Sequence, residues 1–381
     1  MKASPQSAGK PVPVLTLLPL PAVVPLTSPL AVAYRQTEGV ALMDMRNAAD
    51  ENKQKDDSRL SPDLAHYVRD MRGLSGRQDY ALPVTFGFSL TGSDCLKAVL
   101  SYQILSDKPQ AAVVKPFPKG RNKISVWYLL PDTDYRYTVT VTLPKGKTLS
   151  ASSTFRTADT PLIYSVEGGN NVRDIGGWPT ASGRCLSYGK IIRGAAFDGF
   201  LADGATKEYI TATPRGLAFL KHRLGIRFVC DLRDVKPDTE PSPLGPSVKR
   251  VGYAAWGYDR VFTTEYGRAR MKAVFDDLTN PDRYPVYLHC SHGCDRTGTV
   301  CFLIEALLGV SLENCLKDYD YSALFHWARR DNEMLIGMIE VLQKTEGETL
   351  ADKTENYLLS LGITAEQIET LRHIFLPDDT E

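Results

Sequence analysis

Cys290 and Arg296, which are separated by five residues in the segment HCSHGCDRTG, are the side chains best suited to chemistry. The apolar run from Val286 to His289 predicts a strand, and the stretch from Thr297 to Leu308 has helical composition. A loop over a helix N-terminus directs backbone N–H groups and the positive end of the helix dipole at one spot. Arg296 adds a planar fork for two oxygens. The pattern predicts a phosphate-binding loop.

The same positive field would activate Cys290. Cysteines at such positions have a pKa of roughly 3.5 to 7.5, so the thiolate is present at neutral pH. A thiolate facing a bound phosphoryl group predicts transfer through a cysteinyl phosphate that water then hydrolyses. The alternative is a core cysteine on a buried strand beside an ordinary helix N-terminus.

The segment resembles the signature of the cysteine-dependent protein tyrosine phosphatase superfamily. Its Asp-Arg-Thr ending is similar to that of bacterial tyrosine/serine phosphatase-like proteins and of myotubularin-type lipid phosphatases. The resemblance implies a metal-free and cofactor-free enzyme in which Cys290 and Arg296 are catalytic. The loop residues implied to bind substrate are Ser291, His292, Gly293, Cys294 and Thr297.

Further segments resemble the same bacterial group across nearly the whole second half of the chain. They are Asn171 to Gly177, Lys190 to Gly194, Asp231 to Arg233, Asp318-Tyr319 and Tyr357 to Gly362. We expect Arg193 and Arg233 to line the substrate pocket. For Arg173, Asp174 and Asp231, the alternative to a role at the substrate site is a structural ion pair at a strand end.

Two aspartates are candidates for the general acid that protonates the leaving oxygen. Asp295 lies inside the loop, where the myotubularin-like resemblance would place an acid. Asp259 lies 290 − 259 = 31 residues before Cys290, a separation similar to that of the mobile acid loop in the wider superfamily. The alternative for Asp259 is a solvated loop aspartate.

Cys294 departs from the pattern of the bacterial group, which often has lysine at this position, a residue associated with phosphoinositide recognition. The substrate we expect is therefore phosphotyrosine, in a protein or a small phosphoester. Phosphoinositides or inositol phosphates are one alternative, and a non-catalytic phosphate-binding or surface interaction protein is another. Cys294 could also form a disulfide with an oxidised Cys290, unless it merely fills the loop.

Length and composition limit the number of domains and the kinds of partner that we expect. The chain has 381 residues, 45 of them basic and 45 acidic, so it suggests about two domains and carries no net charge to recruit nucleic acid or an anionic membrane. The seven cysteines form no readable disulfide framework. No oligomeric state is predicted.

The N-terminal segment, residues 1–33, contains an apolar run that ends in Ala31-Val32-Ala33, as export signals do. This favours an exported, periplasmic or secreted protein; its many prolines leave a disordered leader in a cytoplasmic protein as the alternative. The same prolines argue against a membrane-spanning helix. Residues 34–79 are expected to form a linker with a short helix from Ser61 to Arg72.

Two folded regions follow. Residues 80–158 contain short alternating strands rich in Val, Thr and Tyr, typical of a small all-β sandwich, and Leu130 to Tyr135 is similar to the tyrosine corner of fibronectin type III modules. Residues 159–381 alternate strands with helices, which predicts an α/β catalytic domain with a central sheet flanked by helices.

Overall fold

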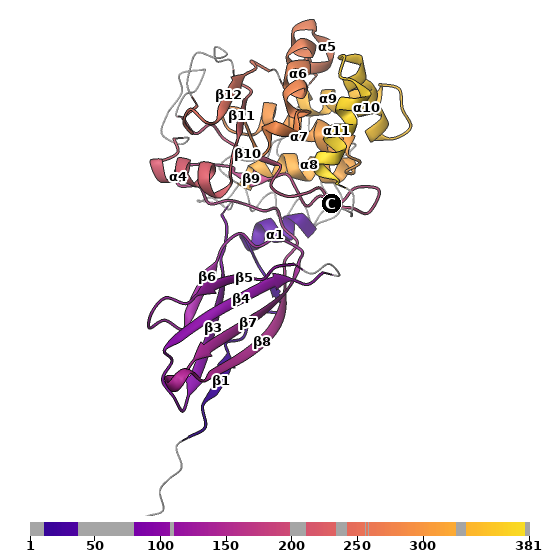
Figure 1. Ribbon diagram of the computed structural model, residues 1–381. Coiled ribbons are helices and arrows are strands. Elements are labelled where there is room, and N and C mark those ends of the chain that lie inside the picture. Colours follow the sequence, from indigo (N-terminus) through magenta and orange to yellow (C-terminus); the bar gives the residue numbers. More distant parts are fainter. Residues whose placement is uncertain are drawn as a thin grey trace, which may run out of the picture. The chain divides into compact units, whose positions relative to one another are not determined.

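The computed structural model (Figure 1) describes residues 11–36, 80–106, 110–198, 211–233, 242–255, 257, 259–324 and 333–377. It divides into two compact units. The β unit combines residues 1–26 with residues 82–160, and the α/β unit combines residues 27–81 with residues 161–381. Both units are therefore assembled from two separate stretches of the chain.

Eight strands in two sheets form the β unit. One sheet has the order β1-β3-β6 and the other the order β2-β8-β7-β4-β5. All neighbours are antiparallel except β2 and β8. The strands are β1 (Val14–Leu17), β2 (Val23–Val24), β3 (Val84–Thr91), β4 (Lys97–Ile104), β5 (Val113–Pro116), β6 (Lys123–Val126), β7 (Asp134–Thr142) and β8 (Thr148–Thr157), with a 3-10 turn at Pro144–Gly146.

One hydrophobic cluster is shared by the two sheets of this unit. Buried and exposed residues alternate along β7, as expected for a strand with one covered face. From the other sheet, the ring of Phe86 lies 4.9 Å from that of Tyr137 and 5.5 Å from that of Phe155. The hydroxyl of Tyr135 accepts a hydrogen bond from the N–H of Leu130 at 2.9 Å, the contact that a tyrosine corner makes.

The N-terminal segment differs from our prediction. Residues 14–17 pair with β3, and residues 23–24 pair with β8, so neither stretch is a disordered leader. Prolines are compatible with short edge strands, which explains how a proline-rich segment joins the sheets. A cleavage after Ala33 would fall inside α1 (Pro29–Gln36). The helix predicted from Ser61 to Arg72 lies outside the described residues.

The α/β unit is built on a five-stranded sheet with the order β12-β11-β13-β10-β9. The first four strands are parallel and β9 is antiparallel to β10. Every residue of β10, β11 and β13 is buried, as in a parallel sheet covered on both faces. The strands are β9 (Arg173–Asp174), β10 (Ile191–Gly194), β11 (Phe228–Asp231), β12 (Lys249–Gly252) and β13 (Val286–His289).

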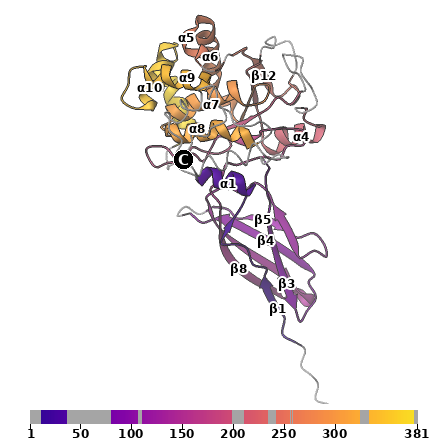
Figure 2. The ribbon, with the colours of Figure 1, turned by 180° about the vertical axis from the view of Figure 1, so that it is seen from behind.

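Helices follow or separate these strands. In Figure 1, α4 lies on the opposite side of the sheet from α10 and α11, and Figure 2 shows α4 and α10 separated in the same way from behind. The helices are α4 (Pro214–Ala218), continued by a π turn (Phe219–Arg223), α5 (Arg260–Thr263), α6 (Glu265–Leu278), a 3-10 turn (Pro281–Arg283), α7 (Asp295–Leu307), α8 (Leu312–Asp320), a 3-10 turn (Tyr321–Leu324), α9 (Glu333–Gln343), α10 (Leu350–Ser360) and α11 (Ala365–Phe375). Along the parts of the chain described, no helix has both the length and the apolar character needed to cross a bilayer.

Side-chain caps fix where several helices begin. Thr364 and Gln367 form a capping box at the start of α11. A second capping box, formed by Thr349 and Asp352, starts α10. Thr264 likewise accepts the N–H of Gly267 and extends α6 toward its N-terminus.

Helix α1 lies in the sequence between the two stretches of the β unit, but it packs within the α/β unit. The guanidinium of Arg35 lies 3.4 Å from the centre of the Trp178 ring and donates to the carbonyl of Gly177 at 2.9 Å. The Tyr34 and Tyr321 rings meet edge to face at 5.0 Å, and the Tyr321 hydroxyl donates to the Ala31 carbonyl. These contacts make α1 part of the core of the α/β unit.

Candidate active site

The predicted phosphate loop lies where β13 ends and α7 begins, at the carboxyl edge of the parallel sheet. Strands β10 and β11 flank β13 on either side, so the residues that follow all three strands come together at this edge. Cys290 directly follows β13, and Asp295 is the first residue of α7. The sheet thus positions the loop that the sequence predicts.

The loop's carbonyl groups are bound from behind. The N–H of Ala196 donates to the carbonyl of Ser291 at 3.1 Å. The carboxamide of Asn171 donates to the carbonyls of His292 and Gly293, and Arg193 donates to that of Gly293 at 2.9 Å. In a trans peptide the N–H of the next residue points the opposite way. The N–H groups that follow these carbonyls are therefore directed away from Asn171 and Arg193.

Gly293 is required at the tightest point of the loop. Its φ is +69°, and a Cβ at this position would lie 2.2 Å from the carbonyl oxygen of Gly194. Any other residue would clash with the backbone that follows β10. Gly298 has a related role, because a Cβ there would lie 2.6 Å from the Tyr319 ring.

Cys290 has the electrostatic environment of a nucleophile. Its side chain is only 3% exposed, and this burial favours the neutral thiol, but the charge of Arg296 and the groups of Thr297 outweigh it and lower the pKa of the thiol. The Thr297 hydroxyl is buried and makes no hydrogen bond of good geometry within the described residues. We therefore attribute its effect to proximity; an ionised sulfur would offer it an acceptor.

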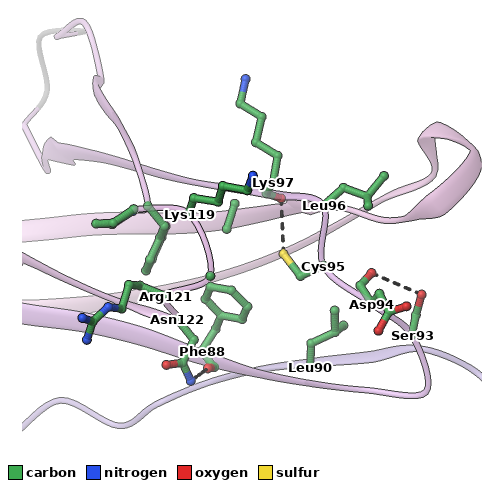
Figure 3. A pocket seen from close by; sticks show the side chains of 14 residues that line it. Phe88, Leu90, Ser93, Asp94, Cys95, Leu96, Lys97, Lys119, Arg121 and Asn122 are labelled. Carbon is green, nitrogen blue, oxygen red and sulfur yellow. Dashed lines mark hydrogen bonds between the residues drawn. The ribbon is translucent and has the colours of Figure 1, made fainter.

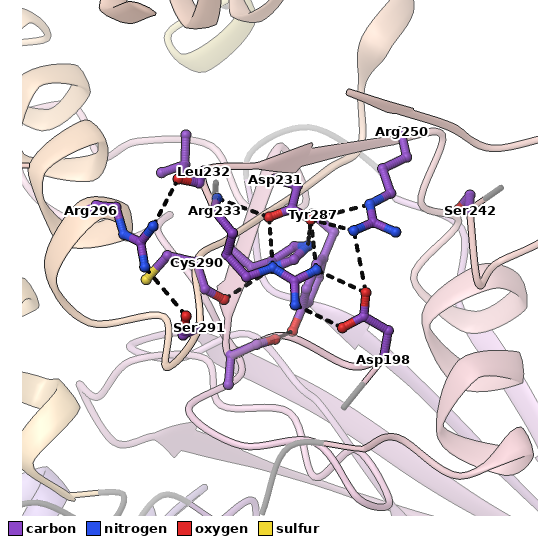
Figure 4. Close-up of polar contacts among 12 residues, drawn as sticks. Asp198, Asp231, Leu232, Arg233, Ser242, Arg250, Tyr287, Cys290, Ser291 and Arg296 are labelled. Carbon is purple, nitrogen blue, oxygen red and sulfur yellow. Dashed lines mark hydrogen bonds and ion pairs between the residues drawn. The ribbon is translucent and has the colours of Figure 1, made fainter. Parts of the chain in front are cut away.

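Arg296 is folded back over the loop. Its guanidinium donates to the Leu232 carbonyl at 3.2 Å and to the Ser291 hydroxyl at 3.3 Å, as the dashed lines in Figure 4 show. Figure 4 also shows this guanidinium beside the sulfur of Cys290. A bound phosphoryl group could accept the same N–H groups in a bidentate contact.

The expectation that Arg193 lines the substrate pocket is wrong. Its side chain is fully buried behind the loop, where it forms an ion pair with Asp318 and donates to the carbonyls of Gly293 and Cys294. Arg173 joins the other oxygen of Asp318 at 3.3 Å. For Arg173, the structure thus shows the structural ion pair that we gave as an alternative.

Arg233, which we also expected to line the pocket, is buried, and its guanidinium is bound by carboxylates. It pairs with Asp231 at 2.7 Å and with both carboxylate oxygens of Asp198 at 2.8 and 2.9 Å (Figure 4). Arg250 reaches the same two carboxylates. Burial raises the pKa of Asp231, but nearby His289 and the two arginines dominate and hold it well below its usual range. These ion pairs connect β12 to the end of β11, beside the loop.

Asp174 has a different environment from these paired carboxylates. Its oxygens accept the N–H groups of Gly176 and Gly189, each at 2.8 Å. Burial outweighs these bonds and raises the pKa of Asp174 to about 6. Asp174 therefore fixes the turn after β9, and the ion-pair interpretation does not apply to it.

The two candidate acids differ in how directly they contact the loop. Asp295 accepts a hydrogen bond from the Tyr319 hydroxyl at 3.4 Å, and its charge acts on the Cys290 thiol. Asp259 precedes α5, in a segment that approaches the loop closely: a Cβ on Gly257 would lie 3.4 Å from the Cα of Arg296. Asp295 therefore belongs to the loop region, whereas the contact with the loop is made by the backbone at Gly257, and the Cβ of Asp259 lies 3.8 Å from a Cβ built on Gly337 of α9.

The side chain of Cys294 contacts groups at the back of the loop. Its sulfur contacts the Asn171 carboxamide at 3.6 Å and the His292 carbonyl at 3.5 Å. Ser291 and His292 are half-buried, whereas Cys294 and Thr297 are buried. These contacts favour the interpretation of Cys294 as a residue that fills the back of the loop.

A separate hollow of about 500 Å³ lies in the β unit, between the turn after β3 and the turn before β6 (Figure 3). Its lining includes Phe88, Lys97, Lys119 and Arg121. In Figure 3 the side chains of Lys97 and Arg121 extend in different directions, so their charges do not converge on one spot. We assign no chemistry to it.

Comparisons with known proteins identify the α/β unit. A solved structure, the core catalytic domain of the PP-IP phosphatase SIW14 from S. cerevisiae in complex with citrate, matches with 20% identity and a TM-score of 0.29, covering 42% of this chain and 86% of that one. A TM-score this low does not establish a shared fold. A search of curated proteins gives no significant match. The model of the tyrosine phosphatase family matches residues 164–377, more than half of the chain. The chain therefore belongs to the tyrosine phosphatase family.

Proposed function

We propose that the protein hydrolyses phosphomonoesters, with phosphotyrosine as the preferred ester, through a cysteinyl-phosphate intermediate. The observation that carries the proposal is Cys290, a buried thiol whose pKa is lowered by Arg296 at the start of α7. A thiol whose pKa is lowered despite burial forms the attacking thiolate more readily than an ordinary buried cysteine. Family membership supports the same chemistry.

The reaction would take place in two steps. The sulfur of Cys290 attacks phosphorus and forms the S–P bond, while the bond from phosphorus to the ester oxygen breaks and that oxygen takes a proton from an acid. Water then attacks phosphorus, the S–P bond breaks and regenerates the Cys290 thiolate, and the proton of the water passes to the carboxylate left by the acid, so that inorganic phosphate is released. Arg296 and the N–H groups of the loop hold the three equatorial oxygens in both steps.

We propose Asp295 as the acid. The influence of its charge on Cys290 places it within electrostatic reach of the nucleophile. Asp295→Asn should slow alkyl phosphates far more than esters with good leaving groups, and should flatten the alkaline limb of the pH profile. If Asp259→Asn produces these effects and Asp295→Asn does not, the acid is Asp259.

Preference for a singly phosphorylated ester is supported by the charges around the loop. Arg296 is the only permanent cation between His289 and Gly298. The nearby guanidiniums of Arg193, Arg233 and Arg250 are engaged with carboxylates. A ligand bearing many phosphates would need further cations to bind tightly.

The direct test is release of phosphate from an aryl phosphate, with and without a chelator. We expect turnover that resists the chelator and is abolished in Cys290→Ser, while that variant still binds vanadate. Activity in Cys290→Ser within tenfold of the wild type would refute the mechanism. A panel of phosphotyrosine peptides, phosphoinositides and inositol phosphates then tests the preference, which a higher kcat/KM on an inositol phosphate would overturn.

For the β unit we propose a fibronectin type III-like fold that serves as a spacer, supported by the Tyr135 corner contact. Export also remains a proposal. It rests on the apolar N-terminal composition alone. Fractionation of the native host cells, with mass spectrometry of the mature N-terminus, tests export directly.

A further inference from the structure

Asn171 is a buried polar residue behind the phosphate loop that the proposed reaction does not yet use. It is 2% exposed and has a φ of +56°, the left-handed region that asparagine tolerates better than most residues. It comes two residues before Arg173, the first residue of β9, and 119 residues before Cys290 (290 − 171 = 119). The unusual backbone therefore serves a contact with a distant part of the chain.

The contacts fix which way the carboxamide faces. Its oxygen accepts from the guanidinium of Arg173, which has only donors to offer. The nitrogen Nδ2 must then face the loop, where it lies 3.1 Å from the carbonyl oxygen of His292 and 3.2 Å from that of Gly293. Ser322 contacts the same nitrogen at 3.2 Å.

Arg173 is itself held in place. Besides its ion pair with the Asp318 carboxylate, it donates to the backbone carbonyl of Asp318 at 2.7 Å. Asp318 on α8 thus holds Arg173, Arg173 holds the carboxamide of Asn171, and Asn171 binds the middle of the loop. None of these side chains needs to touch a substrate.

We propose that Asn171 is a positioning residue that fixes the direction of the loop's N–H groups. By binding the carbonyls of His292 and Gly293 on the outer side, it turns the N–H groups of Gly293 and Cys294 toward the phosphoryl site. The proposal rests on the proposed function of the loop. It adds that the N–H groups of Gly293 and Cys294, in the middle of the loop, depend on a side chain outside the segment from Cys290 to Arg296.

Substitution of the carboxamide tests this directly. Asn171→Asp keeps the shape and the tolerance of positive φ, but replaces the donor with an oxygen that repels both carbonyls. Loss of one preorganised donor lowers kcat by about 100- to 1000-fold, so we expect a fall in kcat of at least about 100-fold. The pH at which Cys290 is half alkylated by iodoacetamide should rise, and vanadate should bind at least about tenfold more weakly.

Thr354→Val is the matched control. Thr354 is equally buried in the same unit, and its hydroxyl donates to the Leu350 carbonyl on α10. We expect this variant to keep the wild-type kcat, alkylation profile and vanadate affinity. If Asn171→Asp does not fold, judged by circular dichroism and thermal unfolding, Asn171→Ser removes the long donor without adding charge and undergoes the same measurements.

The alkylation profile and vanadate affinity do not require turnover. A wild-type protein that hydrolyses no phosphoester would refute the proposed function, yet these two readouts would still test Asn171. A folded Asn171 variant with the wild-type alkylation profile and vanadate affinity would overturn the positioning role. A fall in kcat with both readouts unchanged would overturn it as well, because the N–H groups would then be in place.

Discussion

Two buried carboxyl groups behind the loop, Asp318 and Glu305, should respond in opposite ways to the same chemical change. Asp318 pairs with Arg173 and Arg193, both of which are almost fully buried, and they hold the pKa of this buried carboxyl below its usual value. Asp318→Asn therefore leaves two buried guanidiniums without a counter-charge. Breaking a buried pair costs about 3 to 5 kcal/mol of unfolding free energy. At about 2 to 4 °C per kcal/mol, the melting temperature of the α/β unit should fall by about 6 to 20 °C.

Glu305→Gln should be nearly neutral. Burial, followed by the charge of Asp318, raises the pKa of Glu305 well above its usual value and so favours the uncharged acid in the folded protein. Glutamine replaces it without changing charge, and we expect a loss of at most about 1 kcal/mol at pH 7. Because folding raises the pKa of Glu305 above its ordinary value of 4.5, the stability that this group contributes to the wild type falls as the pH rises from there. The glutamine variant lacks that slope, so its stability relative to the wild type should increase with pH.

Urea-induced loss of phosphatase activity is the suitable assay, because it reports the α/β unit and a protein of two units need not unfold in one step. Both variants are compared with the wild type at pH 5 and pH 8. Equal destabilisation by Glu305→Gln and Asp318→Asn would refute the assignment of charge. A glutamine variant that loses stability relative to the wild type as the pH rises would refute it independently.

Three other changes are informative. Arg296→Lys removes the planar fork and should lower kcat/KM by at least about 100-fold, measured on an aryl phosphate; a loss under tenfold would contradict bidentate binding. Cys294→Ser should leave the rate of peroxide inactivation unchanged, because the Cys294 sulfur contacts Asn171; a Cys290–Cys294 disulfide found by peptide mass spectrometry would contradict this. Arg35→Ala removes the contact with Trp178 and should cost about 1 to 2 kcal/mol, seen as a lower urea midpoint of inactivation; an unchanged midpoint would show that α1 is not part of the unit's core.

The catalytic loop could be predicted because its parts are contiguous. Cys290 and Arg296 lie in one strand-loop-helix segment, and local spacing alone brings them together. The surroundings of the loop could not be predicted in the same way. Arg233 was expected in the pocket, but it is neutralised by Asp198, which follows a different strand and carries no sequence signal of its own. Only the order of strands in the sheet brings the two residues together.

The N-terminal strands were missed for another physical reason. Val14–Leu17 is four residues long, and half-buried and exposed positions alternate along it, so its apolar content resembles that of a leader. Its stability comes from pairing with Thr91, Leu90, Ser89 and Phe88, more than seventy residues later. A strand stabilised by a distant partner leaves little trace in its own composition.

The placement of α1 determines the order in which the protein can be completed during synthesis. Residues 29–36 emerge long before Trp178 and Tyr321, the residues against which they pack. The α/β unit can therefore be completed only after the β unit has been synthesised, when α1 packs against these later residues. A fragment that begins at residue 161 contains the whole family match, yet it would leave Trp178 and Tyr321 without α1. Expression of the catalytic part should accordingly supply residues 27–36, in the same chain or as a separate peptide.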